Sequence, residues 1–102
     1  MDRYNDYGVP YTAPHGSQRV LNESWPLVDE NGKRHARGIP TRPGIEVRVR
    51  VAFETDGEVW LDGVATRWHG RSVFIVVEDP RLLVKHVWVD GEDVKRRFLG
   101  PP

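Results

Sequence analysis

The fold of this chain is decided by the stretch IEVRVRVAF at residues 45–53. Apolar residues, Val47, Val49 and Val51 among them, alternate along it with charged ones. A strand places successive side chains on opposite faces, whereas a helix brings every third or fourth residue together. We therefore predict a β-strand that buries one face.

Short apolar segments with turn residues between them continue to the end of the chain. Asp and Gly or Pro mark the turns at 55–58, 69–70 and 79–81. We expect a second strand at 59–68, interrupted by a bulge or bend at Asp62-Gly63. Further strands are expected at 71–78, at 82–89 and, after a short or 3₁₀ turn at 90–94, at 95–99. Five short strands within about 56 residues favour a sheet closed on itself, because a sandwich needs more chain.

Four runs within residues 45–98 carry a resemblance: GEVW at 57–60, VATRW at 64–68, VFIVV at 73–77, and VWV at 87–89 followed by DVKRR at 93–97. Their pattern resembles the SH3-like barrels of the Tudor and agenet type. In that family a strand with Trp and Ala precedes a hydrophobic strand and an Asp-Val-Arg-like close. The chain is also similar to small uncharacterised proteins of GC-rich bacteria and their phages, in being rich in arginine and free of cysteine.

The predicted fold is therefore all-β, a five-stranded SH3-like barrel at 43–99 with a tail at 100–102. An extended arm rich in proline and glycine precedes it at 1–42, where no period of 3.6 or 2 persists. Within the arm, Asn31-Gly32 predicts a small hairpin with a type I′ turn. Such an arm needs a surface to lie on, which could be its own barrel, a symmetry mate or a partner.

Composition excludes several classes of protein. Fifteen basic residues balance fifteen acidic ones, so no strong overall field draws the chain to nucleic acid. The absence of cysteine excludes disulfides and cysteine-based zinc sites. No signal-peptide pattern and no apolar run of about 18 residues is present. We expect a cytoplasmic or virion protein with no membrane partner.

Catalysis is not expected. The four histidines are scattered without an i, i+4 pair, and the serines lie in no strand-turn-helix elbow. Acid pairs such as Glu78-Asp79 fall in predicted turns. We predict no catalytic residue, no metal, no cofactor and no small-molecule substrate.

The leading hypothesis is a non-catalytic protein–protein interaction or assembly module, whose arm docks on a partner or a symmetry mate. A phage structural or host-interacting protein is one form of it, and a homo-oligomer is another. The arm holds more aromatic surface than a solvated linker needs. The predicted partner-binding residues are Tyr4, Tyr7, Tyr11, Trp25 and Trp68.

A nucleic-acid-binding SH3-like domain is the alternative, since basic side chains gather in two places. One is the cluster at 33–37, and the other forms if the first and fifth strands pair. Ordinary solvated faces would explain both. The candidate residues are Lys33, Arg34, Arg37, Arg48, Arg50, Lys95, Arg96 and Arg97.

The resemblance to Tudor domains also implies a cage of aromatic rings for a methylated lysine or arginine. Trp60, Trp68, Phe74 and Trp88 are the positions where such a cage could arise. We favour instead that two or three of these rings fill the core, as strand aromatics usually do. Trp68 borders the His69-Gly70 turn, so one edge of it should be exposed.

Overall fold

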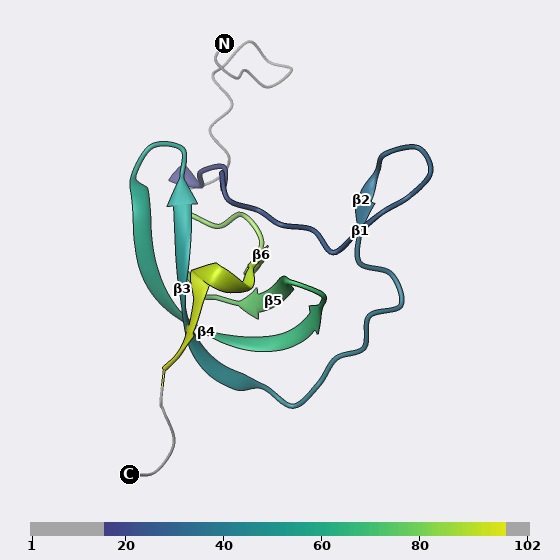
Figure 1. The fold of residues 1–102 in the computed structure, drawn as a ribbon. Helices are drawn as coiled ribbons and strands as arrows, with labels where there is room; N and C mark the ends of the chain where they lie inside the picture. Colours follow the sequence, from purple (N-terminus) through teal and green to yellow (C-terminus); the bar gives the residue numbers. More distant parts are fainter. Residues whose placement is uncertain (1–15, 98–102) are drawn as a thin grey trace.

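The computed structural model of this chain describes residues 16–97, and within them the fold is all-β, as predicted (Figure 1). The strands are antiparallel and a single turn of 3₁₀ helix precedes the last one. In chain order the elements are β1 (Leu27–Val28), β2 (Arg34–His35), β3 (Ile45–Phe53), β4 (Gly57–His69), β5 (Ser72–Val76), β6 (His86–Asp90), η2 (Gly91–Asp93) and β7 (Val94–Arg96).

Five of these strands form one sheet in the order β6-β5-β4-β3-β7. Strands β3 to β6 follow one another as a meander, and β7 returns to the free side of β3. Val49 of β3 therefore lies between Leu61 of β4 and Val94 of β7. Strands β6 and β7 are the two edges, and no ladder within residues 16–97 joins them. The sheet is strongly curved but not closed, so the SH3-like barrel stays a prediction (Figure 1).

Alternate side chains of β3 form one wall of the hydrophobic core. Val47, Val49, Val51 and Phe53 are all nearly inaccessible to solvent, while Arg48 between them is exposed. Side chains from the other strands and from the 77–82 connection complete this core: Ala65, Ile75, Val77, Leu82, Val87 and Val89. Each fully buried aliphatic side chain contributes about 1.5 to 3 kcal/mol, so these residues supply most of the driving force for the fold.

The second strand differs from the prediction. β4 runs through Asp62-Gly63 without interruption, and the irregularity lies between Ala65 and Arg67. Gly63 is needed for close packing instead of a bend, because a Cβ atom there would lie 2.7 Å from Cγ2 of Ile75. The prediction of a bulge or bend at Asp62-Gly63 was therefore wrong.

The fourth strand begins later than predicted. Residues 82–85 lie in a turn and bends, and β6 starts only at His86. Asp79 is the cause, since its carbonyl accepts the N–H of Leu82 (3.0 Å) and its carboxylate accepts the N–H of Arg81 (2.9 Å). These bonds hold the chain in a local turn before the strand can begin. The last strand, by contrast, begins one residue earlier than predicted and covers Val94–Arg96.

The part of the arm from residue 17 onward lies on the chain's own sheet. Val20 forms a β-bridge with Phe53 at the end of β3, and Glu23 forms one with Val89 of β6. Only two residues thus lie between a contact with β3 and a contact with β6. This segment crosses between two strands that do not pair with each other, so it ties them together.

Asn22 is the polar centre of this crossing. Its Nδ2 donates to the carbonyl of Arg50 (2.9 Å) and to Oδ2 of Asp93 (3.0 Å), while its Oδ1 accepts the N–H of Ala52 (2.9 Å). Asp93 is buried and also accepts a hydrogen bond from Nε of Arg50 (2.8 Å). One amide side chain therefore joins the arm to β3 and to η2.

The hairpin predicted at Asn31-Gly32 is present, but its turn is of another type. Val28 pairs with Arg34, and Gly32 has a φ of +82° and donates to the carbonyl of Asp29 (2.9 Å). Glu30 and Asn31 are thus the central residues of the turn and Gly32 follows them, which is the three-residue loop with a glycine bulge. The Asp29 carboxylate stabilises this form, because it accepts the N–H groups of Asn31 (2.8 Å) and Lys33 (2.9 Å).

Residues 24–42, which we call the outer layer, contact the face of the sheet opposite the main core at Trp25 and again at 36–39, while the hairpin between these contacts projects from the sheet (Figure 1). Trp88 points away from the main core and is only 2% exposed, with the ring of Trp25 centred 6.3 Å from its own. Arg67 fastens the layer by donating to the carbonyls of Ala36 (2.7 Å) and Ile39 (3.1 Å). The sheet therefore has apolar contacts on both of its faces.

Candidate functional site

The aromatic rings proposed for a cage already face cations of the chain itself. The guanidinium carbon of Arg67 lies 5.2 Å from the ring centre of Phe74 and 5.4 Å from that of Trp88. These two rings are 5.3 Å apart, so Arg67 takes the place that a methylated side chain would occupy.

The other two candidate rings also lie beside a cation of the chain. Arg42 lies 4.9 Å from the centre of Trp68, and the Lys95 ammonium lies 5.1 Å from that of Trp60. Of the two or three rings expected to fill the core, Trp68 packs against the main core and Trp88 is buried on the other face of the sheet, whereas Trp60 is 38% exposed. Among residues 16–97 the four rings offer no vacant cation cage.

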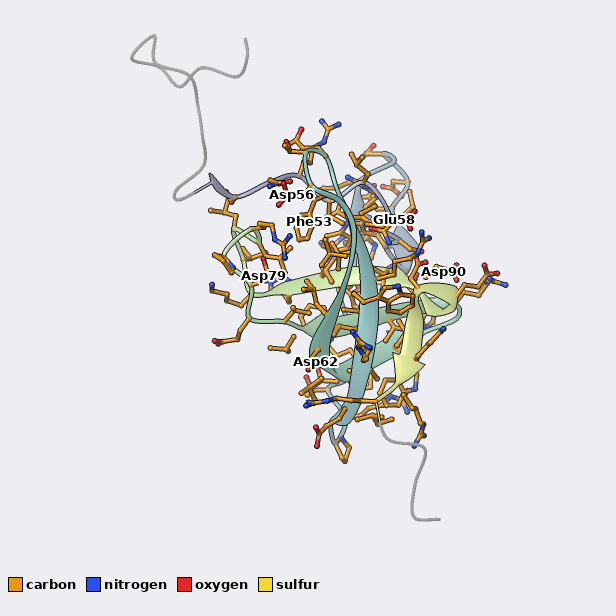
Figure 2. All side chains as sticks on the ribbon, turned by 90° about the vertical axis from the view of Figure 1, so that its left-hand side faces the viewer. Phe53, Asp56, Glu58, Asp62, Asp79 and Asp90 are labelled. Atoms are coloured by element: carbon orange, nitrogen blue, oxygen red, sulfur yellow. The ribbon has the colours of Figure 1, made fainter. Side chains whose placement is uncertain are left out.

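Arg48 of β3 lies opposite Lys95 of β7, as the alternative required, but Arg96 lies opposite Val47 and is therefore on the other face of the sheet. Carboxylates also accompany the basic side chains on the Arg48 face. Figure 2 labels two of these, Glu58 and Asp62, on β4. The ion pairs on this face are Arg48 with Asp62 (3.5 Å), Arg50 with Glu58 (2.6 Å) and Asp93 (2.7 Å), and Arg97 with Glu46 (3.2 Å) and Asp62 (3.5 Å).

These pairs reduce what the patch can offer to a phosphate. The hydrogen bond to Asp93, followed by the one to Glu58, raises the pKa of Arg50. A nucleic acid would have to displace carboxylates that already hold the cations. Lys33, Arg34 and Arg37 are exposed on or beside the hairpin, where Arg34 lies 3.9 Å from Glu23. Nucleic-acid binding therefore remains a prediction that this geometry does not favour.

The predicted partner-binding residues are separated. Tyr4, Tyr7 and Tyr11 lie outside the described residues. Trp25 is half-buried against Trp88, so much of its surface is already used within the chain. Trp68 is also half-buried, and it lines two hollows described below.

Within residues 16–97, no three histidine or acidic side chains gather in a way that could hold a metal ion. No helix in the same range is long and apolar enough to cross a membrane.

An apolar hollow lies between the arm and the loop before β6, and we call it the arm groove. Its volume is about 330 Å³. Apolar atoms supply most of the surface of its wall, and Leu83 and Val84 in that wall are 60% and 52% exposed. The groove is lined by Ser17, Gln18, Arg19, Val20, Glu23, Glu54, Leu82, Leu83, Val84, His86 and Val87.

Polar groups without partners also border the arm groove. Oγ of Ser17 is buried and makes no hydrogen bond within residues 16–97. On β6, the carbonyl of Lys85 accepts from Val77 on the β5 side, whereas that of Trp88 accepts from Ser24 of the arm. Backbone groups of an antiparallel strand point alternately to its two sides, so those of His86 point away from β5, toward the groove.

The walls of the arm groove are held in place by Arg81. Its carbonyl accepts the N–H of Gln18 (2.7 Å), which joins the loop to the arm. Its guanidinium makes two hydrogen bonds of 2.9 Å to Asp79 and pairs with Asp56 at 3.2 Å, while lying over Phe53. Figure 2 shows Asp56, Phe53 and Asp79 at this same end of the sheet. The bond to Asp79, followed by the one to Asp56, raises the pKa of Arg81. Because these bonds join the loop, the arm and the end of β3, the walls of the groove are held in place before a ligand binds.

A second hollow opens at the other end of the core, where the sheet is not closed, and we call it the Trp68 hollow. It has a volume of about 240 Å³ and is lined by Ile45, Val47, Ala65, Trp68, Val73, Gly91, Val94 and Arg96. A neighbouring depression of about 410 Å³ shares Trp68, Val73 and Gly91 with it. Both hollows lie between elements far apart in the sequence, so strand prediction did not reveal them.

Comparison of this chain with family models, with curated proteins and with solved structures found no match, so its function is inferred from this geometry.

Proposed function

We propose that the chain is a non-catalytic protein–protein interaction module that binds an extended segment of a partner protein in the arm groove. The observation that carries this proposal is the combination of an apolar trough with an open backbone edge at His86. Extended peptides bind such edges through main-chain hydrogen bonds and gain specificity from pockets for alternate side chains.

The groove matches each part of an extended peptide. The N–H and C=O of His86 can pair with one peptide residue. Apolar side chains two residues apart would then pack against Val20, Val84 and Val87.

The arm has a different role in this proposal from the one expected from the sequence. Residues 17–23 form a wall of the binding site instead of reaching away to a partner. The curved meander, closed at one end by the arm, supports a partly open SH3-like barrel as the scaffold. A place in the cytoplasm or in a virion is part of the same proposal, since either compartment holds the protein segments that it would bind.

The test is a selection of random heptapeptides, displayed on phage, against the full chain, followed by NMR titration of the ¹⁵N-labelled protein with one synthetic selected peptide. We expect the selected peptides to share apolar residues at positions i and i+2. The amide shift changes in the labelled protein should centre on Ser17, Val20, Val84 and His86.

Matched variants locate the site. Val84→Asp places a charge in the groove and should weaken binding at least about ten-fold, since it would bury a charge against apolar side chains. Val28→Asp makes the same change at an equally exposed position on the hairpin and should leave affinity unchanged. Equal effects of the two variants, or selected peptides that share no pattern, would refute the proposal.

A further inference from the structure

The Trp68 hollow exposes part of the core itself. Ile45, Trp68, Val73 and Val94 pack against the core but are only partly buried, whereas Val49 and Val51 beneath the arm are fully covered. A floor of this kind can accept an aliphatic side chain, which would remove more apolar surface from water.

Two arginines, one in the lining of this hollow and one beside Trp68, have no carboxylate partner within residues 16–97. Arg96 forms part of its lining, and Arg42 lies over the ring of Trp68. Both are exposed, and neither makes an ion pair there, in contrast to Arg48, Arg50 and Arg97 on the outer face of the sheet.

The neighbouring depression carries two carboxylates and one arginine, so taken alone it is slightly negative. Asp90 and Glu92 line it, but Arg71 pairs with both, at 3.2 Å and 2.5 Å. The hydrogen bonds from Arg71 are the main reason that the pKa of Asp90 lies below its ordinary value. Three arginines therefore face two carboxylates around Trp68, and the excess is positive.

We infer that the Trp68 hollow binds an acidic peptide segment in which a carboxylate side chain stands next to an aliphatic one. The aliphatic side chain packs on the floor, and the carboxylates pair with Arg42 and Arg96. This site is distinct from the arm groove and stands on different residues. It also reverses the charge expected from the Tudor resemblance, because Arg42 already covers the Trp68 ring that a cationic ligand would need.

A peptide suits the hollow better than a nucleic acid does. The phosphate backbone would supply the negative charge but no aliphatic chain for the floor of Ile45, Val73 and Val94. Asp90 and Glu92 in the neighbouring depression would oppose a continuous run of phosphates.

The experiment compares two blocked pentapeptides, Asp-Leu-Asp-Ile-Glu and Asn-Leu-Asn-Ile-Gln, titrated into the ¹⁵N-labelled full chain. We expect the acidic peptide to shift the indole N–H of Trp68 and the amides of Val73 and Gly91, and to bind roughly ten-fold more tightly than the neutral one. Raising the salt from about 0.01 to about 0.15 M shortens the Debye length from about 30 to about 8 Å and should remove most of this difference.

Arginine variants provide the control. Arg42→Gln and Arg96→Gln should each weaken the acidic peptide roughly three- to five-fold, as expected for an exposed ion pair. Arg37→Gln removes a cation of the same kind from outside the hollow and should have no effect. Equal binding of the two peptides, or equal effects of all three variants, would overturn the inference. So would shifts confined to the arm groove, or an oligonucleotide that binds the Trp68 hollow more tightly than the acidic peptide.

Discussion

Replacing Asn22 by alanine tests whether the arm is part of the folded domain. The substitution removes three hydrogen bonds, of 2.9, 3.0 and 2.9 Å, that link the arm to β3 and to Asp93. It leaves the N–H of Ala52 and one carboxylate oxygen of Asp93 without this partner. We expect a large loss of stability from a single side chain that no strand pattern would identify.

The size of the loss follows from these bonds. Each contributes about 0.5 to 1.5 kcal/mol, and a buried group left without a partner costs about 1 to 3 kcal/mol. Asn22 is only partly buried, so water replaces some of what is lost. We expect a decrease of about 2 to 3 kcal/mol in the free energy of unfolding. For a domain of this size that corresponds to a fall of roughly 10 to 20 °C in Tm.

The assay is urea unfolding followed by circular dichroism, with Asn31→Ala as the matched control because Asn31 is exposed in the hairpin loop. Asn22→Asp adds a second readout. It keeps the acceptor for Ala52 but sets a carboxylate against Asp93, which raises the pKa of the new group in the folded state. The folded state then holds more protons than the unfolded one, so stability should fall as pH rises from about 4 to 7. A loss in Asn22→Ala no larger than in Asn31→Ala would refute the reasoning.

Three further changes test other parts of the structure. Gly63→Ala should cost about 1 to 3 kcal/mol in urea unfolding, because its Cβ would lie 2.7 Å from Cγ2 of Ile75; an unchanged midpoint would mean that the strands are not this close. The hydrogen bond from Arg81 holds the pKa of Asp79 below its ordinary value of 3.8, so the stability that this pair gives is present above that pH and is lost as pH falls through the folded pKa. As pH falls, the free energy of unfolding should therefore decrease less in Arg81→Gln than in the parent chain. Parallel curves of this free energy against pH would contradict the pairing. Arg67→Met keeps the apolar stem but loses the bonds to the outer layer, so amide exchange should accelerate in that layer and not in β3 or β4; uniform acceleration would contradict a local role.

The strands were predictable where a local pattern determines them. The alternation in β3 needs only the sequence around Val49, and the turns at 54–56 and 70–71 lie close to those predicted at 55–58 and 69–70. The start of β6 was not predictable from apolar character, because the Asp79 carboxylate holds the preceding residues in a turn. Side-chain hydrogen bonds of this kind override strand propensity.

The sites were less accessible to sequence reasoning, since they depend on contacts between distant segments. Asn22 and Asp93 are far apart in the chain, and nothing near either residue predicts their bond. The neutralisation of the basic patch did carry a signal, because the register of β3 with β4 places Arg48 opposite Asp62. The exposed pair Leu83-Val84, next to a turn, was a sign of the arm groove.

Isotope-filtered NMR of the ¹³C-labelled chain with an unlabelled selected heptapeptide is the most direct test of the proposed binding mode. Nuclear Overhauser effects should join the peptide's apolar side chains to the methyl groups of Val20, Val84 and Val87, with the peptide backbone close to the amide of His86. Contacts restricted to the outer face of β3 and β4 around Trp60, with none in the arm groove, would contradict it.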